Sequence, residues 1–148
     1  MGRPADRRDA TQDASGREGV AGPDARPGPA LIAAWSGDPS RALAELEAAK
    51  GRRESTPERL VARAQGAAVA AAAAATRHRP ADPDLAGRCA DRAVALLART
   101  AAAGFFDRPG RRASLDTEPG WDTLRDRAAF RLLRLDLGFP ADPFAHGR

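Results

Sequence analysis

The sequence predicts an all-α protein in which about four helices pack as antiparallel hairpins. Three observations support this prediction. The chain of 148 residues is rich in alanine, leucine and arginine, which favour helix, and poor in β-branched residues. No segment alternates between apolar and polar residues with the period of a strand. Apolar residues instead recur three and four positions apart between start and stop signals for helices.

The clearest helix is predicted over Asp82–Gly104. Asp82 can accept a hydrogen bond from the first turn, and Pro83 suits that turn because it has no N–H to leave unpaired. Gly104 can adopt the left-handed conformation that ends a helix. Between these ends an apolar stripe recurs at helical spacing, through Leu85, Cys89, Ala93, Leu96, Thr100 and Ala103. A second apolar stripe adjoins it, so we expect neighbours on two sides of this helix.

A short turn of helix is predicted over Ala30–Trp35. Its large side chains are Leu31, Ile32 and Trp35. Full burial of a large apolar side chain is worth about 1.5–3 kcal/mol. We therefore expect these three side chains to tuck against the body of the domain.

Two further helices are marked by a capping residue followed by proline. Asp38 and Pro39 start a helix that stops at Gly51. Thr56 and Pro57 start another helix, which continues through a block of alanines to about residue 77. Alanine side chains are small enough to let two helix backbones approach at the short end of the usual range of about 8 to 10 Å.

The segment after the long helix is predicted to close one end of the domain. Phe105 and Phe106 are expected to act as apolar plugs at the end of the helix pair. One helical turn is predicted within residues 108–115, followed by a turn over residues 116–120. Trp121 then re-enters the core.

The last predicted helix covers Asp126–Leu137. Phe130, Leu133 and Leu137 recur at helical spacing and are expected to face inward. Gly138 is expected to end this helix.

Both ends of the chain are predicted to lie outside the domain. Residues 1–29 carry one large apolar residue, Val20, and cannot offset the entropy lost on ordering, so we expect a disordered N-terminal tail. Residues 139–148 contain two prolines and are predicted as an extended C-terminal tail that lays Phe139 across the surface. The helical domain therefore spans residues 30–138.

The basic residues do not indicate a nucleic-acid-binding protein. The formal net charge is +4 at pH 7, and the excess is dispersed along the chain. Only one of the 24 basic residues is a lysine, so the isoelectric point near 10.7 mostly reflects arginine usage. Electrostatic binding to nucleic acid is thus a minority interpretation.

The remaining composition excludes several kinds of site. Cys89 is the only cysteine, which rules out a disulfide framework, and its place on the apolar stripe predicts burial. His78 and His146 have no partners at metal-ligand spacing. We therefore expect no cofactor, no metal and no enzymatic activity. With no signal-peptide pattern and no apolar run of about 20 residues, we expect a cytoplasmic protein that does not contact a membrane.

Recurring small residues at the expected helix contacts suggest a helical hairpin repeat. Residues 87–104 resemble the second helix of a tetratricopeptide repeat, with Ala93 as the close-contact alanine and Leu97 as the large apolar residue. A wider pattern resembles the tetratricopeptide-like C-terminal region of planctomycete-type bacterial serine/threonine protein kinases. That resemblance covers about residues 41–145 and rests on Ala90–Phe105, Leu115–Pro119, Leu124–Arg127, Phe130, Leu133 and Asp136–Phe144.

The resemblance implies a tetratricopeptide-like scaffold without catalytic residues, whose partner would be a kinase or another signalling protein. The sequence has no glycine-rich phosphate loop, no Val-Ala-Ile-Lys strand, no His-Arg-Asp loop and no Asp-Phe-Gly motif. No kinase residue can therefore be assigned in this chain.

Two candidate sites follow from the residues themselves. Trp35, Phe105, Phe106 and Trp121 are candidates to line a groove for a partner peptide, although aromatic residues more often fill a core. Ser114 follows two arginines in a pattern recognised by arginine-directed kinases, and a polar loop or cap residue is the alternative interpretation.

Two other functions remain open from the sequence. An arginine-rich nucleic-acid-binding module would need its arginines on one face, namely Arg52, Arg53, Arg59, Arg63, Arg77 and Arg79. A truncated remnant of a serine/threonine kinase would be marginally folded, because one end of its helical array would be uncapped.

Overall fold

The computed structural model describes residues 27–50, 56–76 and 81–139, and within these ranges the chain is helical and contains no strand. The all-α prediction is thus confirmed. The helices are α1 (Pro29–Trp35), α2 (Pro39–Ala48), α3 (Pro57–Thr76), α4 (Pro83–Ala102), α5 (Pro109–Thr117), α6 (Asp122–Arg125) and α7 (Ala128–Gly138), with short 3₁₀ turns η1 (Phe105–Asp107) and η2 (Pro119–Trp121).

The predicted capping residues start the helices that the sequence assigned to them. The carboxylate of Asp38 accepts a hydrogen bond from the backbone N–H of Arg41 at 2.9 Å, at the start of α2. The carboxylate of Asp82 accepts one from the N–H of Leu85 at 2.8 Å, at the start of α4. Gly104 ends α4 with a φ of 74°, as predicted. These helix ends could be predicted from the sequence because each depends only on residues a few positions away.

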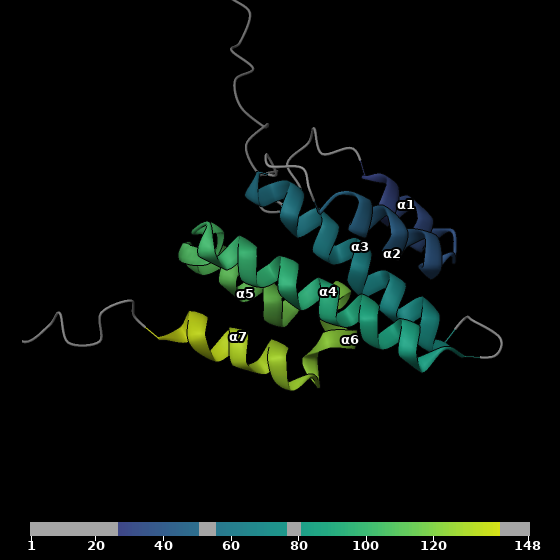
Figure 1. The fold of residues 1–148 in the computed structure, drawn as a ribbon. Helices are drawn as coiled ribbons and strands as arrows, with labels where there is room; N and C mark the ends of the chain where they lie inside the picture. The colour runs from purple at the N-terminus through teal and green to yellow at the C-terminus, as the bar shows by residue number, and fades with distance from the viewer. Residues whose placement is uncertain (1–26, 51–55, 77–80, 140–148) are drawn as a thin grey trace, which may run out of the picture.

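The helices lie in successive layers (Figure 1). The long helices α3 and α4 lie side by side in the middle and make the most extensive contact in the domain. Helices α1 and α2 cover the upper side of α3, and α7 packs on the lower side of α4. The chain ends of the described part, at α1 and α7, therefore form opposite outer layers.

The core is built from small residues on α3 and large ones on the later elements. Ten residues of α3 are buried, of which seven are alanine and one is glycine. The largest fully buried side chains include Trp121, Phe106 and Phe130. A Cβ placed on Gly66 of α3 would lie 3.2 Å from the backbone nitrogen of Leu31, so α1 and α3 approach closely there. Small side chains on α3 thus allow the close approach that the alanine block predicted.

The prediction that the large side chains of α1 tuck against the domain is wrong for Ile32 and Trp35, whereas Leu31 is half-buried. The buried residues of α1 are Ala30, Ala33 and Ala34, while Ile32 and Trp35 are 51% and 59% exposed. The close approach of α1 to α3 at Gly66 accounts for the difference, because small residues such as Ala30, Ala33 and Ala34 suit such a contact. Ile32 and Trp35 are consequently turned outward.

The C-terminal part departs from prediction in three places. Helix α5 is longer than the one turn expected and includes Asp116 and Thr117, which were predicted to lie in a turn. Helix α7 begins at Ala128 rather than Asp126. Phe139 is 70% exposed instead of lying across the surface. The predicted tails of residues 1–26 and 140–148 lie outside the described residues.

Candidate interaction surfaces

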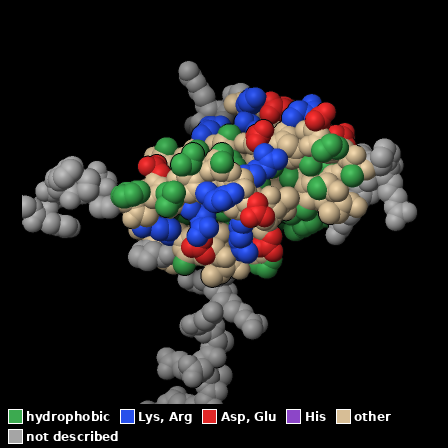
Figure 2. Space-filling model, turned by 90° about the horizontal axis from the view of Figure 1, so that it is seen from below, with side chains coloured by type: hydrophobic (Ala, Val, Ile, Leu, Met, Phe, Trp, Pro, Cys, Tyr) green, Lys and Arg blue, Asp and Glu red, His purple; other side chains and the backbone are tan. Residues whose placement is uncertain are grey.

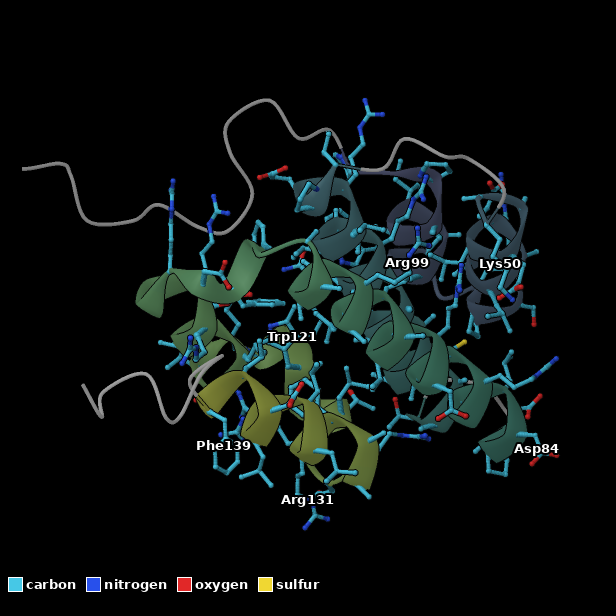
Figure 3. The ribbon with its side chains drawn as sticks, turned by 60° about the vertical axis from the view of Figure 1, so that its left-hand side comes forward. Lys50, Asp84, Arg99, Trp121, Arg131 and Phe139 are labelled. Carbon is cyan, nitrogen blue, oxygen red and sulfur yellow. The ribbon has the colours of Figure 1, made fainter. Side chains whose placement is uncertain are left out.

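Three of the four aromatic residues predicted for a partner groove lie in the core. Phe105, Phe106 and Trp121 are only 3%, 1% and 1% exposed. The two phenylalanine rings pack edge to face with centroids 5.2 Å apart, and the guanidinium of Arg111 lies 4.1 Å from the ring centroid of Phe105. Trp121 points into the space between the helices (Figure 3). The structure therefore does not bring these residues together with Trp35 on one surface.

Trp35 belongs instead to an exposed surface on α1. It lies three residues after Ile32, so the two side chains share one side of the helix, and both are more than half exposed. Helix α1 reads Pro-Ala-Leu-Ile-Ala-Ala-Trp and has no charged residue. We refer to Ile32 and Trp35 as the α1 face.

A second exposed apolar surface lies on α7. Phe130, Leu133 and Leu137 face the core, as predicted. On the opposite side, Leu132, Leu135 and Phe139 are 65%, 60% and 70% exposed. We call these three residues the outer α7 stripe. Seen from below, the surface shows hydrophobic side chains on either side of a central band of basic and acidic side chains (Figure 2).

The outer α7 stripe was not predicted, although the sequence contains a signal for it. Apolar residues occupy five of the eight positions from Phe130 to Leu137. One buried face of a helix needs only about three or four in two turns. An excess of this size indicates a second apolar face on the same helix.

Ion pairs to neighbouring helices hold α7 in place. Nη1 of Arg127, the residue before α7, lies 2.7 Å from Oδ1 of Asp91 on α4. Arg134 pairs with Asp116 on α5. The pairs therefore connect α7, at its start and in its middle, to α4 and α5, while the outer α7 stripe lies on the other side of the helix.

A polar cluster lies between α3 and the η2 turn. The amide of Gln65 donates to the carboxylate of Glu118 at 3.4 Å, and Arg125 donates to the backbone carbonyl of Glu118 at 3.1 Å. Partial burial raises the pKa of Glu118, while the Gln65 hydrogen bond and the nearby Trp121 indole oppose that rise. The indole N–H of Trp121 is buried, and among the described residues no acceptor lies in hydrogen-bonding geometry with it. These contacts join α3 to the C-terminal part of the domain.

Ser114 is not presented as a modification site in the folded chain. Its side chain is 8% exposed, and its hydroxyl donates to the backbone carbonyl of Arg111 at 2.8 Å. The residue lies within α5, where it satisfies a carbonyl of its own helix.

Cys89 is fully buried on α4, as predicted. Burial raises the pKa of its thiol to about 11, so the thiol stays protonated at neutral pH and is a poor nucleophile. Among the described residues, no group of three or more His, Cys, Asp or Glu side chains could hold a metal ion. His78 and His146 lie outside the described residues.

The arginine cluster proposed for nucleic acid is mostly outside the described ranges. Arg52, Arg53, Arg77 and Arg79 fall in the gaps, while Arg59 and Arg63 lie on α3. Elsewhere in the described part, arginines pair with acidic side chains, as in Arg111 with Glu58 at 4.0 Å.

None of the helices in the described ranges has the length and apolar character needed to cross a membrane. Comparisons of the chain with protein-family models, with curated proteins and with solved structures give no match.

Proposed function

We propose that this chain is a non-catalytic, tetratricopeptide-like scaffold for protein–protein interaction. The observation that carries the proposal is the α1 face, where Ile32 and Trp35 are exposed on a helix without any charged residue. Tryptophan is enriched among the residues that dominate binding energy at protein interfaces. A surface of this kind favours an apolar segment of another protein as the partner.

The layered contacts support the repeat-like part of the proposal. The N–H of Asp82 donates to the carbonyl of Ala74 at 3.1 Å, so the chain reverses between α3 and α4 within a few residues. The outer helices pack on these two, α1 and α2 on α3 and α7 on α4. Stacking of each element on its neighbour is the principle of helical repeat arrays. By the resemblance of the sequence, the partner class is a kinase or another signalling protein.

Affinity capture with the full chain tests this function. Proteins retained by the unaltered chain should be lost when Ile32→Ser and Trp35→Ser are combined, and the dissociation constant of a purified partner should rise at least about tenfold. Leu132→Ser is the matched control, because Leu132 is similarly exposed on the opposite outer layer. Capture that does not depend on the α1 face would contradict the proposal.

Two further measurements address the other functions left open by the sequence. Binding to nucleic acid that weakens steeply with salt would favour the arginine-rich module. Rapid hydrogen exchange across α3 and α4 would favour the truncated kinase remnant, whereas strong protection there would show a domain that folds by itself.

A further inference from the structure

The outer α7 stripe has the spacing of one side of a two-helix interface. Leu132, Leu135 and Phe139 follow each other at intervals of three and four residues, and Ala128 lies one turn earlier on the same side. In a pair of parallel helices Leu132 is an a position of the heptad and Ala128 and Leu135 are d positions, while Phe139, the extended residue directly after α7, lies where the next a position would begin. The side that faces the core is about 180° away, at 100° per residue. The stripe is therefore directed away from the core, and most of each of its three large side chains is exposed.

Opposite charges border the stripe on its two edges. Arg131 precedes Leu132 on one edge, and Asp136 follows Leu135 on the other. Arg131 is exposed and points away from the body (Figure 3). Its Nη2 donates to the backbone carbonyl of Asp126 at 2.6 Å. The carboxylate of Asp136 has no partner in the part of the chain that the structure describes.

We propose that the outer α7 stripe binds the same stripe of a second copy of this chain, with the two α7 helices parallel about a two-fold axis. Arg131 and Asp136 then occupy the g and e positions, five residues apart, which face each other across parallel helices. Two-fold symmetry forms this ion pair twice. Antiparallel helices would instead place Arg131 near Arg131 and Asp136 near Asp136 of the second copy, which like-charge repulsion disfavours.

Charge and composition argue for a second copy over other occupants. A membrane surface favours an apolar face bordered by several free basic residues, whereas Arg127 and Arg134, on the side of Arg131, pair with Asp91 and Asp116. The other edge carries the acidic Asp136. The large apolar residues of residues 1–26 are Met1 and Val20, nineteen positions apart, and residues 140–148 contain only Phe144. Neither segment carries enough apolar area to cover three large side chains. Helix α7 is the outermost layer on its side, so the described body leaves room for a second copy (Figure 1).

The size of the stripe sets the strength of the dimer. Three large side chains per copy fall short of the roughly 1,200 Å² of total buried area that stable interfaces reach. Association should therefore be weak and should depend on protein concentration. This association uses the outer layer opposite the α1 face, so its test is independent of the test of the proposed function.

Sedimentation equilibrium of the full chain tests the proposal, at concentrations from about 10 µM to about 1 mM, the range suited to a weak complex. The unaltered chain should shift from monomer to dimer. Leu132→Asp should remain monomeric with an unchanged melting temperature, because Leu132 contributes little to the core. Ile32→Ser, on the α1 face, should dimerise like the unaltered chain. A chain that stays monomeric throughout overturns the proposal.

Charge exchange tests the parallel orientation. Arg131→Asp alone and Asp136→Arg alone should each raise the dissociation constant about tenfold, since each places like charges together at two symmetric positions. The double exchange should restore it to within about threefold. Dimerisation that is unchanged by the single substitutions, or not rescued by the double one, overturns the parallel pairing.

A truncated chain ending at Phe139 distinguishes a second copy from the C-terminal segment. If residues 140–148 covered the stripe in the same molecule, only the truncated chain would dimerise, and the proposal would be wrong for the full chain. Equal dimerisation of both chains supports it.

Discussion

The guanidinium of Arg92 on α4 caps the C-terminus of α2. Its Nη2 donates to the backbone carbonyl of Leu46 at 3.2 Å, and its Nε lies 3.5 Å from Oε1 of Glu47. The side chain of Arg92 is only 12% exposed. A cation at the C-terminus of a helix satisfies a free carbonyl and interacts favourably with the helix dipole. This contact connects α2 to α4 through two residues that are 46 positions apart in the sequence.

Removal of this guanidinium should loosen α2. Arg92→Met keeps most of the aliphatic stem and loses the charge-assisted hydrogen bond, so the free energy of unfolding should fall by about 1–2 kcal/mol. Arg88→Met is the control, because Arg88 lies one turn earlier on α4 and is exposed, and its loss should cost less than about 0.5 kcal/mol. Urea denaturation of the two variants measures both values, and equal values would contradict the role of Arg92.

Two glycines within helices should respond oppositely to alanine. A Cβ on Gly87 meets nothing closer than the end of the Arg127 side chain at 3.9 Å, so Gly87→Ala should stabilise the domain by about 0.5–1 kcal/mol. A Cβ on Gly66 would lie 3.2 Å from the Leu31 nitrogen, and the repulsion should cancel or reverse that gain. Thermal unfolding of the Gly87→Ala and Gly66→Ala variants measures the two changes in stability. A larger gain from Gly66→Ala would show that α1 shifts without cost.

Stability should fall in alkaline solution because of Cys89. Burial raises the pKa of this thiol from 9.0 to about 11. Between these values the unfolded chain loses the proton and the folded chain keeps it, so rising pH favours unfolding. The free energy of unfolding should fall by about 2–3 kcal/mol at pH 11. The chain has no tyrosine and a single lysine, so few other groups titrate in this window.

Cys89→Ala provides the control for this pH dependence. The variant should be less stable at neutral pH, since a buried atom is lost, but its free energy of unfolding should stay nearly constant from pH 9 to pH 11. Urea denaturation at a series of pH values measures the difference. A parallel decline in both proteins would assign the effect to another group.

Ser114 should resist phosphorylation while the domain is folded. An arginine-directed kinase must bind an extended segment, but Ser114 is buried in α5 with its hydroxyl bonded to Arg111. Modification should be at least about tenfold slower in the folded chain than in a peptide of residues 108–118, because it requires local opening. Mass spectrometry of timed samples measures both rates. Comparable rates would show that α5 opens readily.

Local signals made the helix positions predictable. Asp38, Asp82 and Gly104 fix helix ends through bonds and conformations within a few residues, and the structure places them as expected. The buried stripe of α4 was also readable, because the period of 3.6 residues requires no knowledge of the neighbour. Residues 109–117 were harder, since the capping residue there is Arg108, whose side chain makes no cap hydrogen bond.

The exposed apolar surfaces could not be predicted from local sequence signals. Burial depends on which helix lies opposite, so the sequence alone assigned Trp35 inward and left the outer face of α7 unrecognised. The structure turns Trp35 outward because Gly66 and the alanines of α1 bring two backbones together. The other three aromatic residues are buried because other elements pack over them, namely Phe105, Phe106 and Trp121.

The amino-acid sequence by itself determined that this chain is helical, where most of its helices begin and end, and that Cys89 and Phe130 are buried. Those features follow from bonds and periodicity within one segment. Only the tertiary structure decided which apolar side chains remain at the surface, namely Ile32, Trp35, Leu132, Leu135 and Phe139. Packing is a property of pairs of segments, and the close approach of α1 to α3 at Gly66 favours small side chains between them.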